Sequence, residues 1–299
     1  MATKTLSENI NQAISDFNGI KQAIIDKGVQ VPSGTPTSQY GTKIGEIQSG
    51  GGDTTAKDMI ERKVTSLTVP SDVTTIGTNV FRLWSTLTSI ILPDGITSIE
   101  DNAFYGCTKL ALASLPDNLT TIGQSAFSSC TNLALTSLPL NLKSIRGNAF
   151  LNCTNLALTS LPNSVTSIGS YAFKSCSNIE LTSLPPNLTA INTSSFEGCT
   201  KVKLISLPDT ITAIYSRGFA ECTNLALTSL PASITRIEVA AFINCKALKT
   251  ITFMGKPDRI DSNAFGGCTN LTSITCPWAE GEVSGSPWGA TRASITYTG

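Results

Sequence analysis

The residues of this chain with the most reactive side chains are its cysteines, and their spacing is regular. Because thiols in this number could form disulfides or bind zinc, their arrangement matters. The chain has no Cys-x-x-Cys pair and no histidine, so we expect no metal site. Because most of the thiols share one repeat position, we expect them to form a ladder of reduced and buried side chains that face the same way. Eight of them recur every 23 residues, namely Cys107, Cys130, Cys153, Cys176, Cys199, Cys222, Cys245 and Cys268.

The absence of histidine also excludes Ser-His-Asp and Cys-His catalysis and the usual zinc hydrolases. No phosphate-binding loop or dinucleotide fingerprint occurs. Two carboxylates, as in glycoside hydrolysis, are the remaining catalytic option. The acidic residues of the repeats occupy variable positions and form no repeated pair, so we interpret them as part of a solvated face and expect no catalytic residues, no cofactor and no enzymatic activity. These acidic residues are Glu100, Asp101, Glu180, Glu197, Glu221 and Glu238.

The elements that position these side chains are copies of one 23-residue phrase. A unit of this size cannot bury its own apolar face, so neighbouring units must stack. The fold class predicted is a mixed, β-rich solenoid of about nine units with a small α-helical N-terminal segment. Each unit is expected to contain a strand in its leucine-rich run, a second short strand in N-L-T-S-I-G and one helical turn. The phenylalanines of that turn are Phe81, Phe104, Phe127, Phe150, Phe173, Phe196, Phe219, Phe242 and Phe265.

Units in the middle of the chain carry leucine at a different place in the first strand. The outer unit Leu87 to Pro93 has apolar residues at its first, fourth and sixth places. The middle unit has leucine at its third place, Leu135. Strict strand alternation would then point either Leu135 or the polar pair Thr136 and Ser137 the wrong way. We therefore predict a local kink, whose direction the alternation does not set.

Composition divides the chain into four parts. Residues 1–48 are predicted to be a helical docking or oligomerisation segment, followed by a Gly-rich linker at 49–58. The solenoid is predicted at residues 59–276 and a C-terminal cap at residues 277–299. The first helix has apolar residues at heptad spacing, which fits either a short coiled coil or an amphipathic helix folded onto its neighbour. Those residues are Leu6, Ile10, Ala13, Phe17, Ile20 and Ile24.

Two features of the C-terminal part suggest how the stack ends. Trp278 and Trp288 suit a cover over the open end, and an aromatic ligand site is the alternative. Ile295 and Tyr297 alternate as a last strand.

The charge and hydropathy patterns limit the partners. Lysine plus arginine equals aspartate plus glutamate, 21 of each, with no basic run, so we expect no nucleic acid partner. No run reaches the ~18 apolar residues of a membrane span, so we expect no membrane insertion. The first residues lack the pattern of a signal peptide, so we expect the protein to be made and folded in a cytoplasm.

The phrase L-x-x-I-x-L-P-x-x-I-T-S-I-x-x-x-A-F-x-x-C, from Leu87 to Cys107, resembles the BspA-like leucine-rich repeats. The resemblance covers residues 59–276 and implies a right-handed superhelix that serves in adhesion or ligand binding without catalytic residues. The flanks Ile20 to Ile47 and Cys276 to Thr291 are similar to segments of tail-associated proteins from phages and prophages of Gram-positive bacteria.

These resemblances predict a non-enzymatic, tail-associated phage virion protein that recognises the host surface. It would be assembled in the host cytoplasm and located in the virion. Its expected partners are other virion proteins, bound through the N-terminal helix, and a host cell-surface protein or glycan, with homo-oligomerisation as a further option. One alternative is a purely structural component of a virion or tail-like particle. Another is an adhesin on a bacterial cell surface.

Variation among the repeats indicates where a ligand would bind. The residues after the second strand and the residue after each phenylalanine differ from unit to unit, whereas core positions barely change. Tyrosine and arginine most often supply binding energy at exposed positions. Turns that merely tolerate substitution are the alternative explanation, and the Ser/Thr strand face with Ser137 and Ser160 is the rival surface. The predicted ligand-facing residues are Arg146, Tyr171, Lys174, Tyr215 and Arg217.

Overall fold

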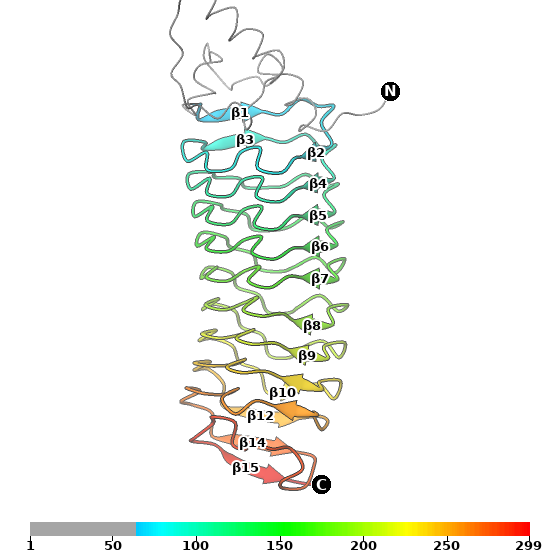
Figure 1. The fold of residues 1–299 in the computed structure, drawn as a ribbon, viewed down its shortest axis with the longest axis vertical. Helices are drawn as coiled ribbons and strands as arrows, with labels where there is room; N and C mark the ends of the chain where they lie inside the picture. The colour runs from blue at the N-terminus through cyan, green and yellow to red at the C-terminus, as the bar shows by residue number, and fades with distance from the viewer. Residues whose placement is uncertain (1–63) are drawn as a thin grey trace, which may run out of the picture.

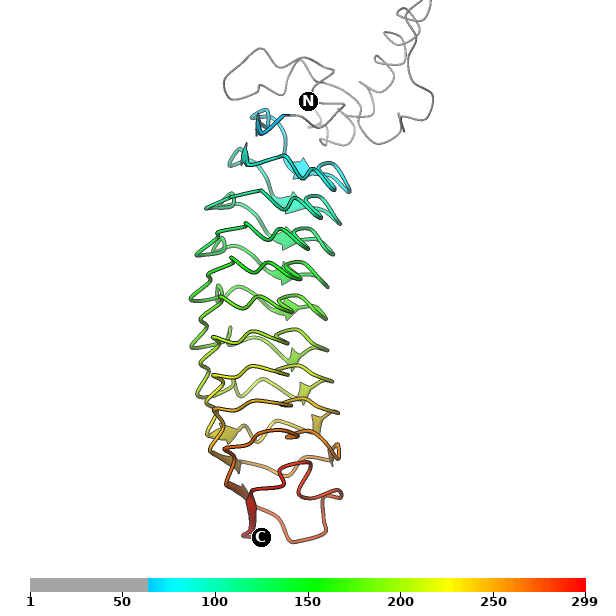
Figure 2. The ribbon, with the colours of Figure 1, turned by 90° about the vertical axis from the view of Figure 1, so that its left-hand side faces the viewer.

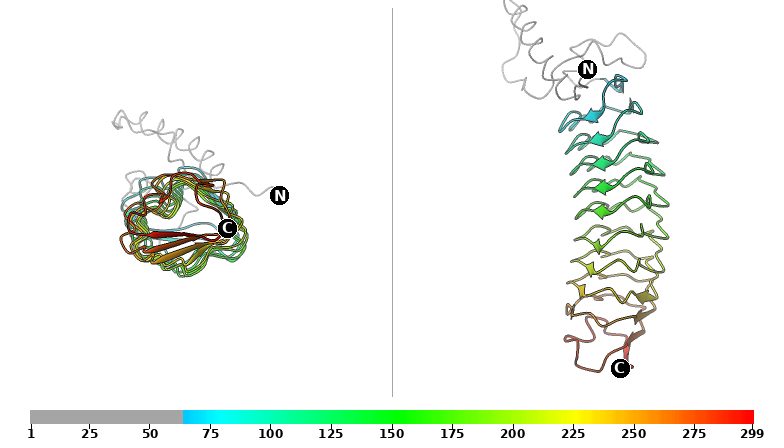
Figure 3. Two further views of the ribbon diagram at one scale, coloured as in Figure 1. Left: turned by 90° about the horizontal axis from the view of Figure 1, so that it is seen from below. Right: turned by 90° about the vertical axis from the view of Figure 1, so that its right-hand side faces the viewer.

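A computed structural model describes residues 64–299, which form an elongated solenoid whose turns stack along one axis (Figures 1 and 2). Viewed along that axis, the successive turns superimpose (Figure 3). The predicted helical segment at 1–48, with its heptad residues Leu6 to Ile24, and the linker at 49–58 lie outside the described residues.

One side of the solenoid is a column of short parallel strands, which we call the strand column. Each strand has two residues and ends in a buried isoleucine. Partners lie 23 residues apart, so that Ile99 pairs with Ile122. The second strand predicted for each unit is therefore confirmed. The strands are β2 (Thr75–Ile76), β4 (Ser98–Ile99), β5 (Thr121–Ile122), β6 (Ser144–Ile145), β7 (Ser167–Ile168), β8 (Ala190–Ile191), β9 (Ala213–Ile214), β11 (Arg236–Ile237) and β13 (Arg259–Ile260).

The leucine-rich runs form strands only toward the two ends of the solenoid. In the units that begin at Leu110, Leu133, Leu156, Ile179 and Val202, this run contains no strand. The prediction of a first strand in every unit is therefore wrong for the middle of the molecule. The strands that do form are β1 (Ser66–Thr68), β3 (Ser89–Ile91), β10 (Ser229–Leu230), β12 (Thr250–Phe253), β14 (Ser273–Cys276) and β15 (Ser294–Tyr297).

The predicted kink is present in the middle units, and the structure shows its direction. Leu133 and Leu135 are both buried, whereas Thr136 and Ser137 both point to solvent. Burying a second leucine is favourable by about 1.5–3 kcal/mol. Water can form hydrogen bonds with the exposed backbone groups that would otherwise pair with a neighbouring strand. One backbone bond to the next unit survives, from the Ala157 amide to the Leu135 carbonyl at 3.0 Å. The bends lie at Thr136, Thr159, Thr182 and Ile205.

The segment that carries phenylalanine and cysteine consists of tight turns and not of the predicted helical turn. Ser125 and Ser129, on either side of Phe127, have positive φ values of 54° and 61°. The Cys130 amide donates to the Phe127 carbonyl at 3.0 Å, which closes the second turn. Left-handed residues four positions apart interrupt right-handed helical geometry. No helix occurs within residues 64–299.

The core is a stack of phenylalanine rings beside a ladder of thiols. Consecutive rings lie nearly parallel, as for Phe127 and Phe150 with centroids 5.5 Å apart. The carbonyls of the stacked phenylalanines from Phe81 to Phe242 each accept a hydrogen bond from the cysteine of the next unit, as from Cys130 Sγ to Phe104 O at 3.0 Å. All nine cysteines are buried and none of them forms a disulfide, and burial raises the pKa of the Cys153 thiol far above its usual range. The predicted ladder of reduced cysteines is confirmed, and its thiols also act as hydrogen-bond donors.

The last turns of the solenoid are packed around two tryptophans. Trp278 and Trp288 lie edge-on to Phe253, with ring centroids 5.1 and 6.2 Å away. The two indoles are 2% and 0% exposed, so neither is available as an aromatic ligand site. The last strand predicted around Ile295 and Tyr297 is present as β15, which pairs with β14.

Candidate functional site

The five predicted ligand-facing residues lie on the loops between the strand column and the phenylalanine stack, which we call the loop edge. Arg146 and Tyr215 directly follow β6 and β9. Tyr171, Lys174 and Arg217 belong to the turns around the phenylalanines. The structure brings Lys174 and Arg217 together around one carboxylate and places the Tyr171 ring beside Lys174, whereas Arg146 and Tyr215 lie in separate contacts.

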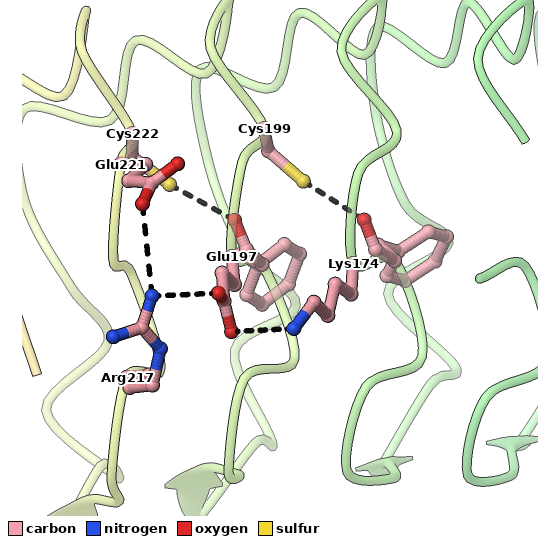
Figure 4. A network of polar contacts seen from close by, with 8 residues as sticks. Lys174, Glu197, Cys199, Arg217, Glu221 and Cys222 are labelled. Carbon is pink, nitrogen blue, oxygen red and sulfur yellow. Dashed lines mark hydrogen bonds and ion pairs between the residues drawn. The ribbon is translucent and has the colours of Figure 1, made fainter. Parts of the chain in front are cut away.

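Glu197 is the centre of the larger group (Figure 4). Arg217 Nη2 donates to Glu197 Oε1 at 2.7 Å, and Lys174 Nζ lies 3.2 Å from Glu197 Oε2. Arg217 Nη2 also lies 3.6 Å from Glu221 Oε1. Lys174, Glu197 and Arg217 come from three successive units, so this Glu197 network ties those units together. The Glu197 side chain is only 9% exposed.

The pKa of Glu197 shows that its carboxylate is held in the ionised form. Burial alone raises this pKa, but hydrogen bonds from Arg217, Ser194 and Lys174 outweigh burial and lower the pKa to about 2. The charges of Lys174 and Arg217 are therefore partly neutralised within the protein. From the sequence, Glu197 was interpreted only as a solvated carboxylate at a variable position. Its position one repeat after Lys174 was the signal that could have identified the pair.

The other predicted residues make weaker contacts. Lys174 Nζ lies 5.6 Å from the ring centroid of the exposed Tyr171. Tyr215 lies under the guanidinium of Arg236 at 5.7 Å. Arg146 is the most open, with a side chain that is 59% exposed and Nη1 3.6 Å from Asp101 Oδ1. These residues keep donor groups or ring faces that a ligand can reach.

Two of the predicted residues have an unusual backbone conformation. Tyr171 and Arg217 have φ values of 61° and 58°, in the left-handed region. An L-residue in this region costs roughly 1–2 kcal/mol, and bulky side chains are rare there. The same position in the other units holds mainly small residues or asparagine, namely Asn79, Asn102, Ser125, Asn148, Ser194 and Ala240.

Two expectations about the variable positions need correction. The residue after each phenylalanine was expected at a solvent-facing turn, but Ser128, Glu197 and Ala220 are buried. The acidic residues serve contacts between units and do not lie on a freely solvated face. Glu238 Oε2 accepts hydrogen bonds from the Ser216 amide at 3.0 Å and from the Ser216 hydroxyl at 2.8 Å.

The strand column is interrupted next to the Glu197 network. Strands β7 and β8 do not pair, and the column is split into two sheets at this point. Asn192 Nδ2 donates to the Ile168 carbonyl at 2.6 Å. In the preceding unit, the equivalent hydrogen bond runs from the backbone amide of Gly169 to the Ile145 carbonyl. The Lys174–Glu197 ion pair spans the same two units on the loop edge. The network therefore supports the stack where strand pairing is lost.

Ser195 is a buried hydroxyl in this region, and we expect Ser195→Ala to stabilise the protein by about 1–2 kcal/mol. Among residues 64–299 its Oγ has no hydrogen-bond partner, and the residue is 0% exposed. Alanine already occupies this place in other units, for example Ala172 and Ala241. Urea denaturation followed by circular dichroism measures the change. Ser194→Ala is the matched control of opposite sign, because the Ser194 hydroxyl bonds to Glu197. An unchanged or lower stability of Ser195→Ala would contradict the assignment.

The rival surface is also accessible, since Ser137 and Ser160 are exposed in the kinked units. Within residues 64–299, no group of three or more histidine, cysteine, aspartate or glutamate side chains is arranged to hold a metal ion. The same residues include no helix of the length and apolarity needed to span a membrane.

Comparisons with known proteins agree with this architecture. A family model described as the BspA type leucine rich repeat region matches residues 60–180 and 167–283. A leucine-rich repeat protein from Bacteroides ovatus is 25% identical with a TM-score of 0.52, over 78% of this chain and 73% of that chain. A leucine rich cell surface protein from Faecalibacterium prausnitzii is 23% identical with a TM-score of 0.48, over 79% of each chain. No curated protein matches this sequence.

Proposed function

We propose that this chain, which belongs to the family of proteins with BspA-type leucine-rich repeats, is a non-enzymatic recognition protein. Solenoids of stacked repeats present extended surfaces that bind other molecules. The surface proposed is the loop edge with Arg146, Tyr171, Lys174, Tyr215 and Arg217, and the ligand is a cell-surface protein or glycan. No catalytic family is indicated by the comparisons.

The observation that carries this proposal is the left-handed backbone of Tyr171 and Arg217. The fold accepts asparagine or serine at this position, so the bulky side chains are not needed to form the turn. Residues kept in strained conformations cluster at functional sites, where their side chains serve binding. Tyrosine and arginine are also the residue types that dominate binding energy at interfaces.

The place of action that we favour is a bacterial cell surface, where the protein would act in adhesion. Membership of the BspA-type family supports this location, because the resemblance implies adhesion or ligand binding. A tail-associated position in a virion is the competing proposal, and it rests on the flanks. Of these, Ile20 to Ile47 lies outside the described residues. A purely structural virion component is the third proposal, and it offers no reason for an exposed, strained Tyr171.

Tyr171→Asn tests the proposal, because it separates binding from stability. Asparagine tolerates the left-handed conformation, so we expect the variant to be more stable by about 1 kcal/mol. We expect its binding to bacterial cells and isolated cell-wall material to be at least tenfold weaker than that of the wild type, since an exposed aromatic anchor is lost. Fluorescently labelled protein and a sedimentation assay measure the binding, and urea denaturation measures the stability.

Asn148→Tyr is the reciprocal control, because Asn148 occupies the same repeat position with φ 56°. It should lose about 1 kcal/mol of stability without changing the affinity. Cell binding by Tyr171→Asn at the wild-type level would contradict a role for Tyr171. Absence of wild-type binding to any cell or wall sample, with recovery of the protein from purified virions, would favour the virion proposals.

A further inference from the structure

The loop edge has a second distinctive feature at the first turns of the solenoid. The residue that follows each strand of the column alternates between glycine and a charged residue, in the order Gly77, Glu100, Gly123, Arg146 and Gly169. A Cβ at Gly123 would lie 2.5 Å from the Glu100 carbonyl carbon and 2.6 Å from the Asp101 amide nitrogen. Its φ is not in the left-handed region, so lack of space is what requires glycine. Gly123 therefore lets adjacent turns approach closely, and Glu100, Gly123 and Arg146 all line one hollow.

This hollow is a pocket of about 360 Å³ at the carboxyl ends of β4 and β5. Its volume lies within the range of small-molecule sites. Its charged lining residues are Glu100, Asp101 and Arg146. The remaining lining residues are Thr78, Ser98, Ile99, Thr121 and Gly123.

The pocket holds both acceptors and donors that the protein leaves free. Glu100 Oε2 accepts from the Thr78 amide and hydroxyl, each at 3.1 Å, which leaves Oε1 without a partner among the described residues. Asp101 Oδ1 accepts from the Gln124 amide at 2.7 Å, which likewise leaves Oδ2 free. Within the described part of the chain, the Arg146 guanidinium contacts only Asp101, at 3.6 Å, so most of its five N–H donors are available.

The charges of these groups select the ligand class. Two carboxylates repel a phosphate or carboxylate ligand, and the Arg146 guanidinium opposes a bound cation. A neutral polyhydroxy ligand meets neither penalty. Each of its hydroxyls can donate to a carboxylate and accept from the guanidinium, and such charge-assisted bonds are the stronger kind.

We infer that this pocket binds one neutral hexose residue of a surface glycan. The inference rests on the proposed function and narrows its ligand from a protein or glycan to a glycan. Arg146 and Glu100 are then the contact residues. The Glu197 network lies further along the same edge, where Lys174 and Arg217 stay partly exposed.

The test is a titration of the ¹⁵N-labelled full chain with methyl glycosides of glucose, galactose, mannose and N-acetylglucosamine, followed by amide chemical shifts. We expect at least one glycoside to cause saturable shifts at Thr121, Gly123 and Arg146. Its dissociation constant should be on the order of 1–10 mM, as for a ligand with few contacts. Arg146→Ala and the isosteric Glu100→Gln should each weaken this binding at least tenfold.

Arg259→Ala is the matched control, because Arg259 is an exposed arginine paired with Asp261 and lies outside the pocket. It should bind the glycoside like the wild type. No shift with any glycoside, shifts confined to the exposed Ser137 and Ser160, or an unchanged affinity in Arg146→Ala would each overturn the inference. Cell binding that depends on Tyr171, without chemical-shift changes at the pocket residues, would contradict this inference but not the proposed function. Absence of cell binding would contradict the proposed function itself.

Discussion

Phe150→Ala is expected to lower the free energy of unfolding by about 4 kcal/mol. The Phe150 ring is 0% exposed and stacks between Phe127 and Phe173, with centroids 5.5 and 5.4 Å away. The fold offers nothing to fill the space, because the rings on either side are held by identical turns. Alanine would therefore leave a cavity in the middle of the stack and remove two ring contacts.

The position of this cavity should also change how the solenoid unfolds. Each unit contacts only its neighbours, so a weak central unit reduces the coupling between the two halves. We expect urea denaturation followed by circular dichroism to show a lower midpoint and a broader transition. Leu151→Ala is the control, because Leu151 is the half-buried neighbour of Phe150 and should cost about 1 kcal/mol. A transition of unchanged midpoint and width in Phe150→Ala would contradict the role of the ring stack.

Glu197→Gln is expected to destabilise the protein by about 3 kcal/mol at pH 7. The variant removes the carboxylate that pairs with Arg217 and Lys174 at 2.7 and 3.2 Å. The carboxylate pKa is lowered from 4.5 to about 2 in the folded protein, so the folded state favours its ionised form. The stabilisation is fully present above pH 4.5 and is lost as the pH falls through about 2.

This pH dependence distinguishes loss of the charge from a simple packing defect. The stability difference between wild type and Glu197→Gln should be constant from pH 7 to about 5 and should shrink toward pH 2. Urea denaturation at several pH values measures it. Glu221→Gln is the control, because Glu221 is 53% exposed and lies 3.6 Å from the same arginine. It should cost less than about 0.5 kcal/mol. A difference for Glu197→Gln that does not change with pH would contradict the ionised network.

Much of the fold could be predicted because every unit has to bury apolar residues at the same repeat positions. A phenylalanine and a cysteine every 23 residues can be buried only if the units stack in register. The strand column and the buried thiols follow from that periodicity. The hydrogen bond from each thiol to a phenylalanine carbonyl does not, because it depends on how closely adjacent turns approach.

The two departures from the predicted secondary structure both depend on a backbone conformation that sequence periodicity does not specify. Sequence periodicity shows that Leu135 competes with Thr136 and Ser137 for the inside, but not which side prevails. Burial of leucine outweighs strand pairing only when the backbone can bend outward, and this depends on the neighbouring turns. The turns around Phe127 likewise require left-handed residues, and serine at those positions gives no such signal.

The candidate site could be predicted only in part. Variation along the repeats identified Lys174 and Arg217, but Glu197 was missed as their common partner. Variation shows which positions differ and says nothing about pairing across units. Whether a charge faces solvent or a neighbouring carboxylate is decided by the distance between turns, and that distance is a property of the stack.

The sequence by itself determined the repeating unit, the stacked architecture and the inward positions of phenylalanine and cysteine, because hydrophobic periodicity acts within each unit. Only the tertiary structure decided which charged residues are paired, where the strand column breaks between β7 and β8, and that Glu100, Gly123 and Arg146 line one pocket. Those features arise between units, where side chains about 23 positions apart come into contact. The spacing of adjacent turns is set by the packing of the whole solenoid.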